Sequence, residues 1–115
     1  MERYPKAVWR NLRDLVGLAY EVELGRELGK LAEHFDEWRE GKIDAFDLTE
    51  LVHKYHQGPA RELWKRYADR PMVEMQVASA IARGILRRED VPEETWPYVE
   101  ELIERYRFGG EGGTA

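Results

Sequence analysis

The chain has 115 residues, no cysteine and a formal net charge of −5 at pH 7. A chain of this length usually folds as a single domain around one core. Without cysteine, disulfide frameworks, thiolate metal sites and thiol catalysis are excluded. The acidic balance offers no general attraction to a polyanion, so nucleic acid is not an expected partner.

The composition also bears on where the protein works. No apolar run approaches the roughly 20 residues that a membrane span needs, and the N-terminus lacks the apolar core of a signal peptide. A cytoplasmic protein without membrane contact is therefore expected. Asn11 is the only asparagine, and arginine outnumbers lysine 13 to 5. Few heat-labile amides fit a thermophilic source, although a GC-rich genome would also favour arginine.

Two apolar stripes with helical spacing run through the first segment, from about Pro5 to Glu40. The first stripe consists of Val8, Leu12, Leu15, Ala19 and Val22. The second stripe consists of Leu24, Leu28, Leu31, Phe35 and Trp38. The stripes are out of phase near Leu24. Either one long helix presents two faces, or the helix breaks near Gly17 or Gly25, because glycine disfavours a helix interior.

Glycine and proline divide the rest of the chain into helices as well. Asp44 is an expected N-cap, and Gly58 and Gly84 are expected helix ends. Four further helices are predicted, at residues 44–58, 60–69, 72–83 and 97–107. The predicted fold is all-α: a compact array of about five helices in a single domain, 1–108. The Gly-rich residues 109–115 are expected to form a flexible tail.

The densest polar group is the candidate ligand or metal cluster of Glu50, His53, His56 and Arg61. Glu50 and His53 stand three residues apart on a predicted helix, as do His53 and His56, so each pair can share a side. Histidine and carboxylate are common metal ligands. A di-metal helical bundle would need a second Glu-x-x-His, which the sequence lacks. Two histidines at a helix end, stabilising its last carbonyls, are the structural alternative.

Arg83, Arg87 and Arg88 form the candidate anion patch. They close a basic block, residues 59–88 with a balance of +4, and an acidic block follows at 89–107 with a balance of −5. The acidic block would repel a polyanion. The two blocks could instead pair within one fold or across a dimer.

A complete catalytic set is missing, because no phosphate-binding loop, dinucleotide fingerprint or nucleophile elbow occurs. No cofactor or metal is therefore predicted. Four tryptophans in a small domain and the second apolar stripe indicate surplus interaction surface. The leading hypothesis is a non-enzymatic interaction or regulatory module, either a homodimer or a subunit of a larger bacterial assembly. The alternative is a small metal-dependent hydrolase or ligand-binding protein built on Glu50, His53, His56 and Arg61.

Overall fold

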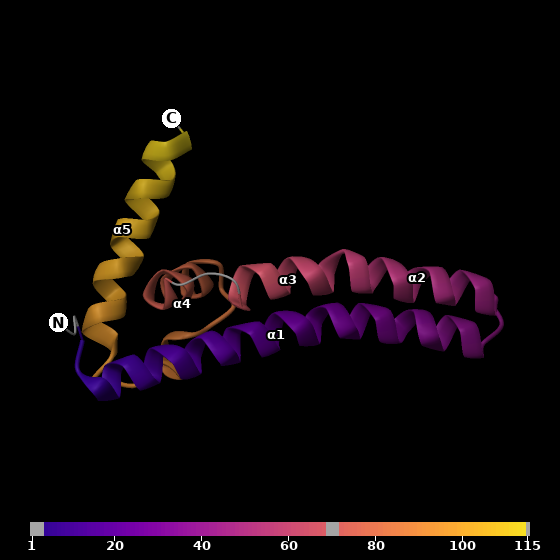
Figure 1. Ribbon diagram of the computed structural model, residues 1–115, viewed down its shortest axis with the longest axis horizontal. Coiled ribbons are helices and arrows are strands. Elements are labelled where there is room, and N and C mark those ends of the chain that lie inside the picture. Colours follow the sequence, from indigo (N-terminus) through magenta and orange to yellow (C-terminus); the bar gives the residue numbers. More distant parts are fainter. Residues whose placement is uncertain (1–3, 69–71, 115) are drawn as a thin grey trace. The chain divides into compact units, whose positions relative to one another are not determined.

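The computed structural model describes residues 4–68 and 72–114, with side chains described as far as Arg105. Within these ranges the chain is all-α, as predicted, with a long N-terminal helix (Figure 1). The elements are α1 Lys6–Arg39, α2 Ala45–Gln57, α3 Pro59–Ala68, α4 Val73–Ala82, a short 3-10 helix Arg88–Asp90, and α5 Trp96–Thr114. Five α-helices match the expected number. The boundary predicted at Pro71 lies outside the described residues.

Helix α1 is continuous, so of the two alternatives the single long helix is confirmed and the break near Gly17 or Gly25 is wrong. A Cβ added at Gly17, Gly25 or Gly29 would meet no atom within 4 Å, so these glycines do not serve a close helix crossing among the described residues either. The apolar faces on both sides of Gly25 favour the helix strongly enough to outweigh the cost of glycine, about 1 kcal/mol per residue.

The helix ends follow the predicted capping chemistry. Gly41, with φ +78°, ends α1, and the Lys42 N–H bonds the Glu37 carbonyl across it at 2.8 Å. Gly84, with φ +77°, ends α4 in the same way. Only glycine adopts this left-handed conformation readily. Asp44 caps α2 by accepting a bond from the Asp47 N–H at 2.7 Å.

Close contacts divide the chain into two units that share α1. Unit 1 comprises Met1–Ala19 and Pro71–Ala115, and unit 2 comprises Tyr20–Arg70. The sequence predicted one domain over 1–108, and cooperative folding of the two units as one domain stays a prediction. Flexibility of residues 109–115 also stays a prediction, although α5 extends to Thr114, beyond the helix end expected at Arg107.

Unit 1 has a dense apolar core supplied by the start of α1, by α4, by the connector and by α5. Its buried side chains include Val8, Leu12, Leu15, Ala19, Val77, Ala78, Ala80, Leu86, Val91, Val99, Leu102 and Ile103. The first apolar stripe is thus core from Val8 to Ala19, as predicted. Glu74 and Gln76 are also buried, which the periodicity of α4 did not predict.

A polar contact and an aromatic cluster join the start of α1 to the start of α5 within unit 1. The Asn11 amide donates to the hydroxyl of the buried Thr95 at 2.8 Å and to the Glu94 carboxylate at 3.1 Å. The Tyr4 ring makes edge contacts with Trp9 and Tyr98, at centroid distances of 5.0 and 5.2 Å. Both contacts fix the register between α1 and α5 in this unit.

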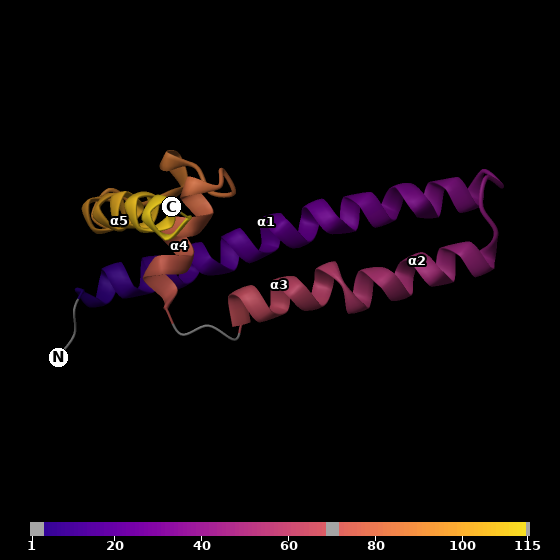
Figure 2. The same ribbon diagram turned by 90° about the horizontal axis from the view of Figure 1, so that it is seen from above.

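Unit 2 is a helical hairpin. The second part of α1 runs beside α2 and α3, which follow each other along it in the reverse direction (Figure 2). Its buried apolar side chains are Leu48, Leu63 and Tyr67. The Tyr20 and Tyr67 rings stack at 5.2 Å across the hairpin. Two layers of helix with so few buried side chains leave much of the apolar surface uncovered.

None of the helices in the described ranges combines the length and apolar composition needed to cross a bilayer.

Candidate functional site

The side chains of the candidate ligand or metal cluster lie at the surface of α2 and α3. Glu50, His53 and His56 all have exposed side chains. Among the residues that the structure describes, no group of three histidine or acidic side chains is placed to hold a metal ion. His34, a possible further ligand, contacts the Glu37 carboxylate through Nδ1 at 2.7 Å instead. All three side chains lie on the surface of α2, and their role as ligands stays a prediction.

An arginine in a first helical turn could brace a carboxylate such as Asp44 or Asp47 in the interior, but Arg61 is exposed in the first turn of α3. Asp44 and Asp47 bond each other's backbone in the capping box of α2. Arg61 and His56 do share one surface hollow of about 410 Å³. The other lining residues are Tyr20, Leu24, Gln57, Ala60 and Trp64. The hollow lies entirely within unit 2 and is lined mainly by apolar and aromatic side chains.

The arginines of the candidate anion patch are engaged locally. Arg83 donates to the Ser79 hydroxyl at 3.1 Å. Arg87 lies 3.6 Å from the Glu89 carboxylate. Arg88 pairs with Glu93 at 3.1 Å and lies over the Trp96 ring at 4.0 Å. The basic and acidic blocks therefore pair with each other where they adjoin, and these contacts compete with an anion for the guanidinium groups.

A basic surface that the sequence analysis missed lies at the start of α1. Lys6, Arg10 and Arg13 line a hollow of about 440 Å³ together with Trp9. Their spacing of four and three residues places the three cations along one side of the helix. The four- and three-residue spacing is the sequence signal for this surface, whereas the net charge of residues 1–58 is negative and gives no sign of it.

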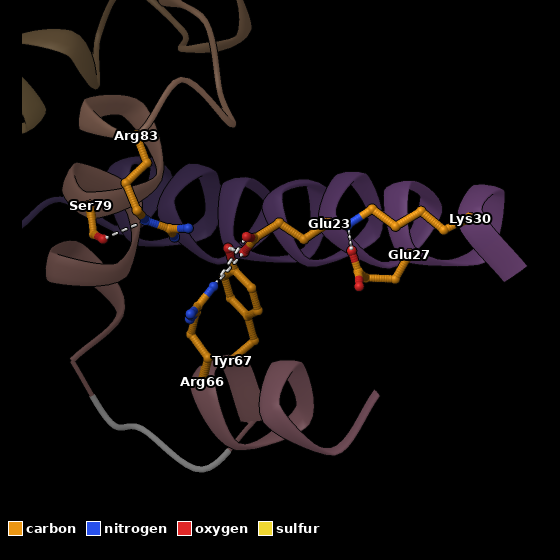
Figure 3. Close-up of polar contacts among 7 residues, drawn as sticks. All are labelled: Glu23, Glu27, Lys30, Arg66, Tyr67, Ser79 and Arg83. Carbon is orange, nitrogen blue, oxygen red and sulfur yellow. Dashed lines mark hydrogen bonds and ion pairs between the residues drawn. The ribbon is translucent and has the colours of Figure 1, made fainter. Parts of the chain in front are cut away.

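One flank of the unit 2 hairpin is charged. The Glu23 carboxylate on α1 accepts a hydrogen bond from the Tyr67 hydroxyl and ion-pairs with Arg66 at 3.1 Å (Figure 3). One turn further along α1, Lys30 pairs with Glu27 at 2.7 Å (Figure 3). Because Glu23 is largely buried, its contacts stabilise the hairpin more than an exposed pair would.

The opposite flank of the hairpin is apolar, and we call it the apolar flank. It comprises Leu24, Leu28, Phe35, Val52 and Trp64. Leu24 and Trp64 line the hollow described above, which places this side of α1 and α3 together. Leu28 lies one turn beyond Leu24, and Val52 one turn before His56, which lines the same hollow. Helix geometry therefore gathers these side chains on one side of the hairpin.

The apolar flank is open to solvent. Leu28 is 49 % exposed, Val52 37 % and Trp64 54 %. Helical periodicity predicts that Val52 and Trp64 stand on apolar faces of their helices, and burial of Trp64 would be expected from it; the structure shows that expectation to be wrong. Trp38, at the end of the second stripe, is also 42 % exposed, in line with the expectation that some tryptophans stay on the surface. Large apolar side chains gathered on one side are typical of a protein-binding surface.

Neither protein-family models nor curated proteins nor solved structures yield a match to this chain.

Proposed function

We propose that this chain is a non-enzymatic, cytoplasmic interaction module whose binding surface is the apolar flank of unit 2. The module either associates with itself or serves as a subunit of a larger assembly. Its task is to present the helical hairpin of unit 2 to a protein surface.

The observation that carries this proposal is the imbalance between buried and exposed apolar side chains in unit 2. The hairpin buries Leu48, Leu63 and Tyr67 but leaves Leu28, Val52 and Trp64 of the apolar flank exposed to water. Burying apolar surface contributes about 25 cal/mol per Å², so a partner that covers the flank gains substantial free energy. Enzymatic catalysis has no comparable support, because the candidate ligands of α2 do not converge.

The test compares co-purification of partners for three forms of the chain. The wild type and Leu28→Glu and Phe46→Glu variants are purified gently from the source organism, and co-eluting proteins are quantified by mass spectrometry. Phe46 is 87 % exposed but stands on α2, outside the apolar flank, so it is a matched control. We expect a stoichiometric protein, either another chain or a differently tagged second copy, with the wild type and with Phe46→Glu.

Leu28→Glu should lose that protein, because a charge at the centre of the flank would be buried without a partner. If all three forms elute as bare monomers, or if Leu28→Glu retains the partner in full, the flank is not a binding surface.

A further inference from the structure

The exposed side of α1 that adjoins the apolar flank carries a second helical seam. Its residues alternate at spacings of four and three along the helix, the spacing of a coiled-coil seam. They are Glu21, Gly25, Leu28, Ala32, Phe35 and Arg39, and we call them the outer seam. Phe35 is half-buried and the other five are exposed. The whole seam belongs to unit 2 and spans about 27 Å of helix at the usual rise per residue.

The outer seam is complementary to its own reversed copy. Residues at equal distances on either side of Lys30 form three pairs: Leu28 with Ala32, Phe35 with Gly25, and Glu21 with Arg39. Each apolar pair joins a large side chain to a small one, and the outer pair joins opposite charges. These are the layers that meet when two such helices pack antiparallel.

We propose that the partner of the apolar flank is a second copy of this chain, docked antiparallel through the outer seam, with the two-fold axis passing between Leu28 and Ala32. This inference rests on the proposed function and names its partner. Leu24 borders the outer seam and also lines the hollow with Trp64, so the interface continues onto the rest of the apolar flank. A two-fold contact of this kind is closed, and it yields a dimer.

Charge and volume both disfavour the parallel arrangement. Parallel packing would place Glu21 against Glu21 and Arg39 against Arg39, and like charges at close range are destabilising. It would also face Gly25 with Gly25, which leaves a void, and Phe35 with Phe35, which overfills the layer. In the antiparallel arrangement each layer has a similar volume and each end has opposite charges.

The antiparallel dimer also explains the glycine at position 25. Glycine weakens a helix interior relative to alanine. A Cβ at Gly25 would meet nothing within 4 Å in the single chain, so packing within the chain does not require glycine there. In the dimer, Gly25 faces the Phe35 ring of the second copy, and the missing side chain makes room for it.

The outer charges can exchange partners without a large penalty. In the single chain Arg39 pairs with Asp36 at 3.0 Å, and both side chains are about two-thirds exposed. Such exposed pairs contribute little. Arg39 can therefore turn to Glu21 of the second copy, where a neighbouring helix excludes part of the water.

The experiment measures the dimer dissociation constant by analytical ultracentrifugation for the wild type and for charge-reversed full-length chains. The variants are Glu21→Arg, Arg39→Glu and the double variant, with Glu33→Arg as a control, exposed on α1 but off the outer seam. Each single variant should raise the dissociation constant about tenfold, since two symmetric pairs change from attraction to repulsion. The double variant should restore it to near the wild-type value, and Glu33→Arg should leave it unchanged.

A second measurement keeps the proposal testable if a charge reversal impairs folding. The chain has no native cysteine, so Glu21→Cys and Arg39→Cys chains of different mass each carry a single thiol. Oxidation of the mixture should give a disulfide-linked heterodimer, whereas each chain alone should remain uncrosslinked.

Three outcomes would overturn the antiparallel dimer. Crosslinking of each cysteine chain with itself would show parallel packing. A wild-type chain that stays monomeric at high concentration would exclude the second copy as partner. In that case, loss of a different stoichiometric partner with Leu28→Glu would leave the proposed function standing. A double variant as weak as either single variant would show that Glu21 and Arg39 do not meet.

Discussion

The two units of this molecule differ in what they do with similar apolar stripes on the same helix. In unit 1 the α1 stripe from Val8 to Ala19 is covered, and α4, α5 and their connector add further buried side chains. In unit 2 the stripe from Leu24 to Trp38 is covered on one edge and open elsewhere. Helical periodicity is therefore the same where the stripe forms a core and where it forms a surface.

The difference lies in the number of helices available to cover α1. Unit 1 brings three helical elements and a connector together, whereas unit 2 opposes α1 with α2 and α3 laid end to end. Because α2 and α3 form a single row of helix, they cover only about one face of α1. A stable core usually needs every apolar face of a helix to be covered. A second copy on the outer seam would supply the missing layer of unit 2.

Truncating a leucine should have a large effect on the stability of the single chain in the first stripe and almost none in the second. Leu12→Ala, at a fully buried position of unit 1, should lower the free energy of unfolding by about 3 kcal/mol, through lost burial and a cavity. Leu28→Ala should change it by less than about 0.5 kcal/mol at low protein concentration, because Leu28 is exposed in the single chain. Urea denaturation followed by circular dichroism measures both.

At high concentration Leu28→Ala should weaken the dimer, and the stability gained by association should shrink with it. Equal losses for Leu12→Ala and Leu28→Ala at low concentration would contradict the contrast between a covered and an open stripe.

Removing the Tyr67 hydroxyl should loosen the hairpin of unit 2. Tyr67→Phe should cost about 1–2 kcal/mol, because the largely buried Glu23 carboxylate loses a hydrogen-bond donor. Arg66→Gln should cost less than about 1 kcal/mol, since Arg66 is nearly half exposed. Hydrogen exchange across α3 measures the loss of hairpin stability in each variant. A larger loss for Arg66→Gln than for Tyr67→Phe would show that the ion pair, and not the Tyr67 hydrogen bond, is the stronger contact of Glu23.

Adding a methyl group at Gly25 should raise the stability of the single chain but lower the affinity of the dimer. Gly25→Ala should stabilise the single chain by about 0.5–1 kcal/mol, since alanine favours the helix and the Cβ meets no atom. The same change should weaken the dimer, because it fills the space opposite Phe35. Thermal unfolding at low concentration measures the first effect and sedimentation the second. If Gly25→Ala raised both the stability of the single chain and the affinity of the dimer, Gly25 would not face the second copy.

The smallest effect is expected at Glu94 in unit 1. Its own backbone N–H and the Asn11 amide hold the pKa of the Glu94 carboxyl below its usual value. Since the folded pKa is the lower one, Glu94 contributes stability above the unfolded pKa, and this is lost as the pH falls through the folded pKa. Asn11→Ala should raise the Glu94 pKa part of the way back, which a carboxyl-carbon NMR titration would show. An unchanged pKa would mean that the amide does not reach the carboxylate in solution.

Local chemistry explains which parts of the fold could be predicted. Asp44, Gly41 and Gly84 act on their own helix ends, so the boundaries of α1, α2 and the end of α4 follow from the residues nearby. The continuity of α1 through Gly25 was harder to predict. It depends on whether the small free-energy contributions of many helix residues together outweigh the cost of glycine in a helix interior. The burial of Glu74 depends on what surrounds α4, which no pattern in the sequence reports.

The candidate sites show the same division. Spacing placed Glu50, His53 and His56 close along one helix, but a binding site needs groups from several directions, and no other described element brings ligands to them. The surplus apolar surface was expected from the tryptophans and the second stripe. Its position on one flank became visible once the hairpin showed which sides of α1, α2 and α3 face each other.

The chain's own residues thus specify helices, their ends and the existence of two apolar stripes, because these depend on contacts within a few residues. The division of those stripes into a core in unit 1 and an exposed flank in unit 2 depends on which segments distant in sequence cover them. That is a property of packing in three dimensions, and the hydrophobic free energy is gained only where a neighbour excludes water.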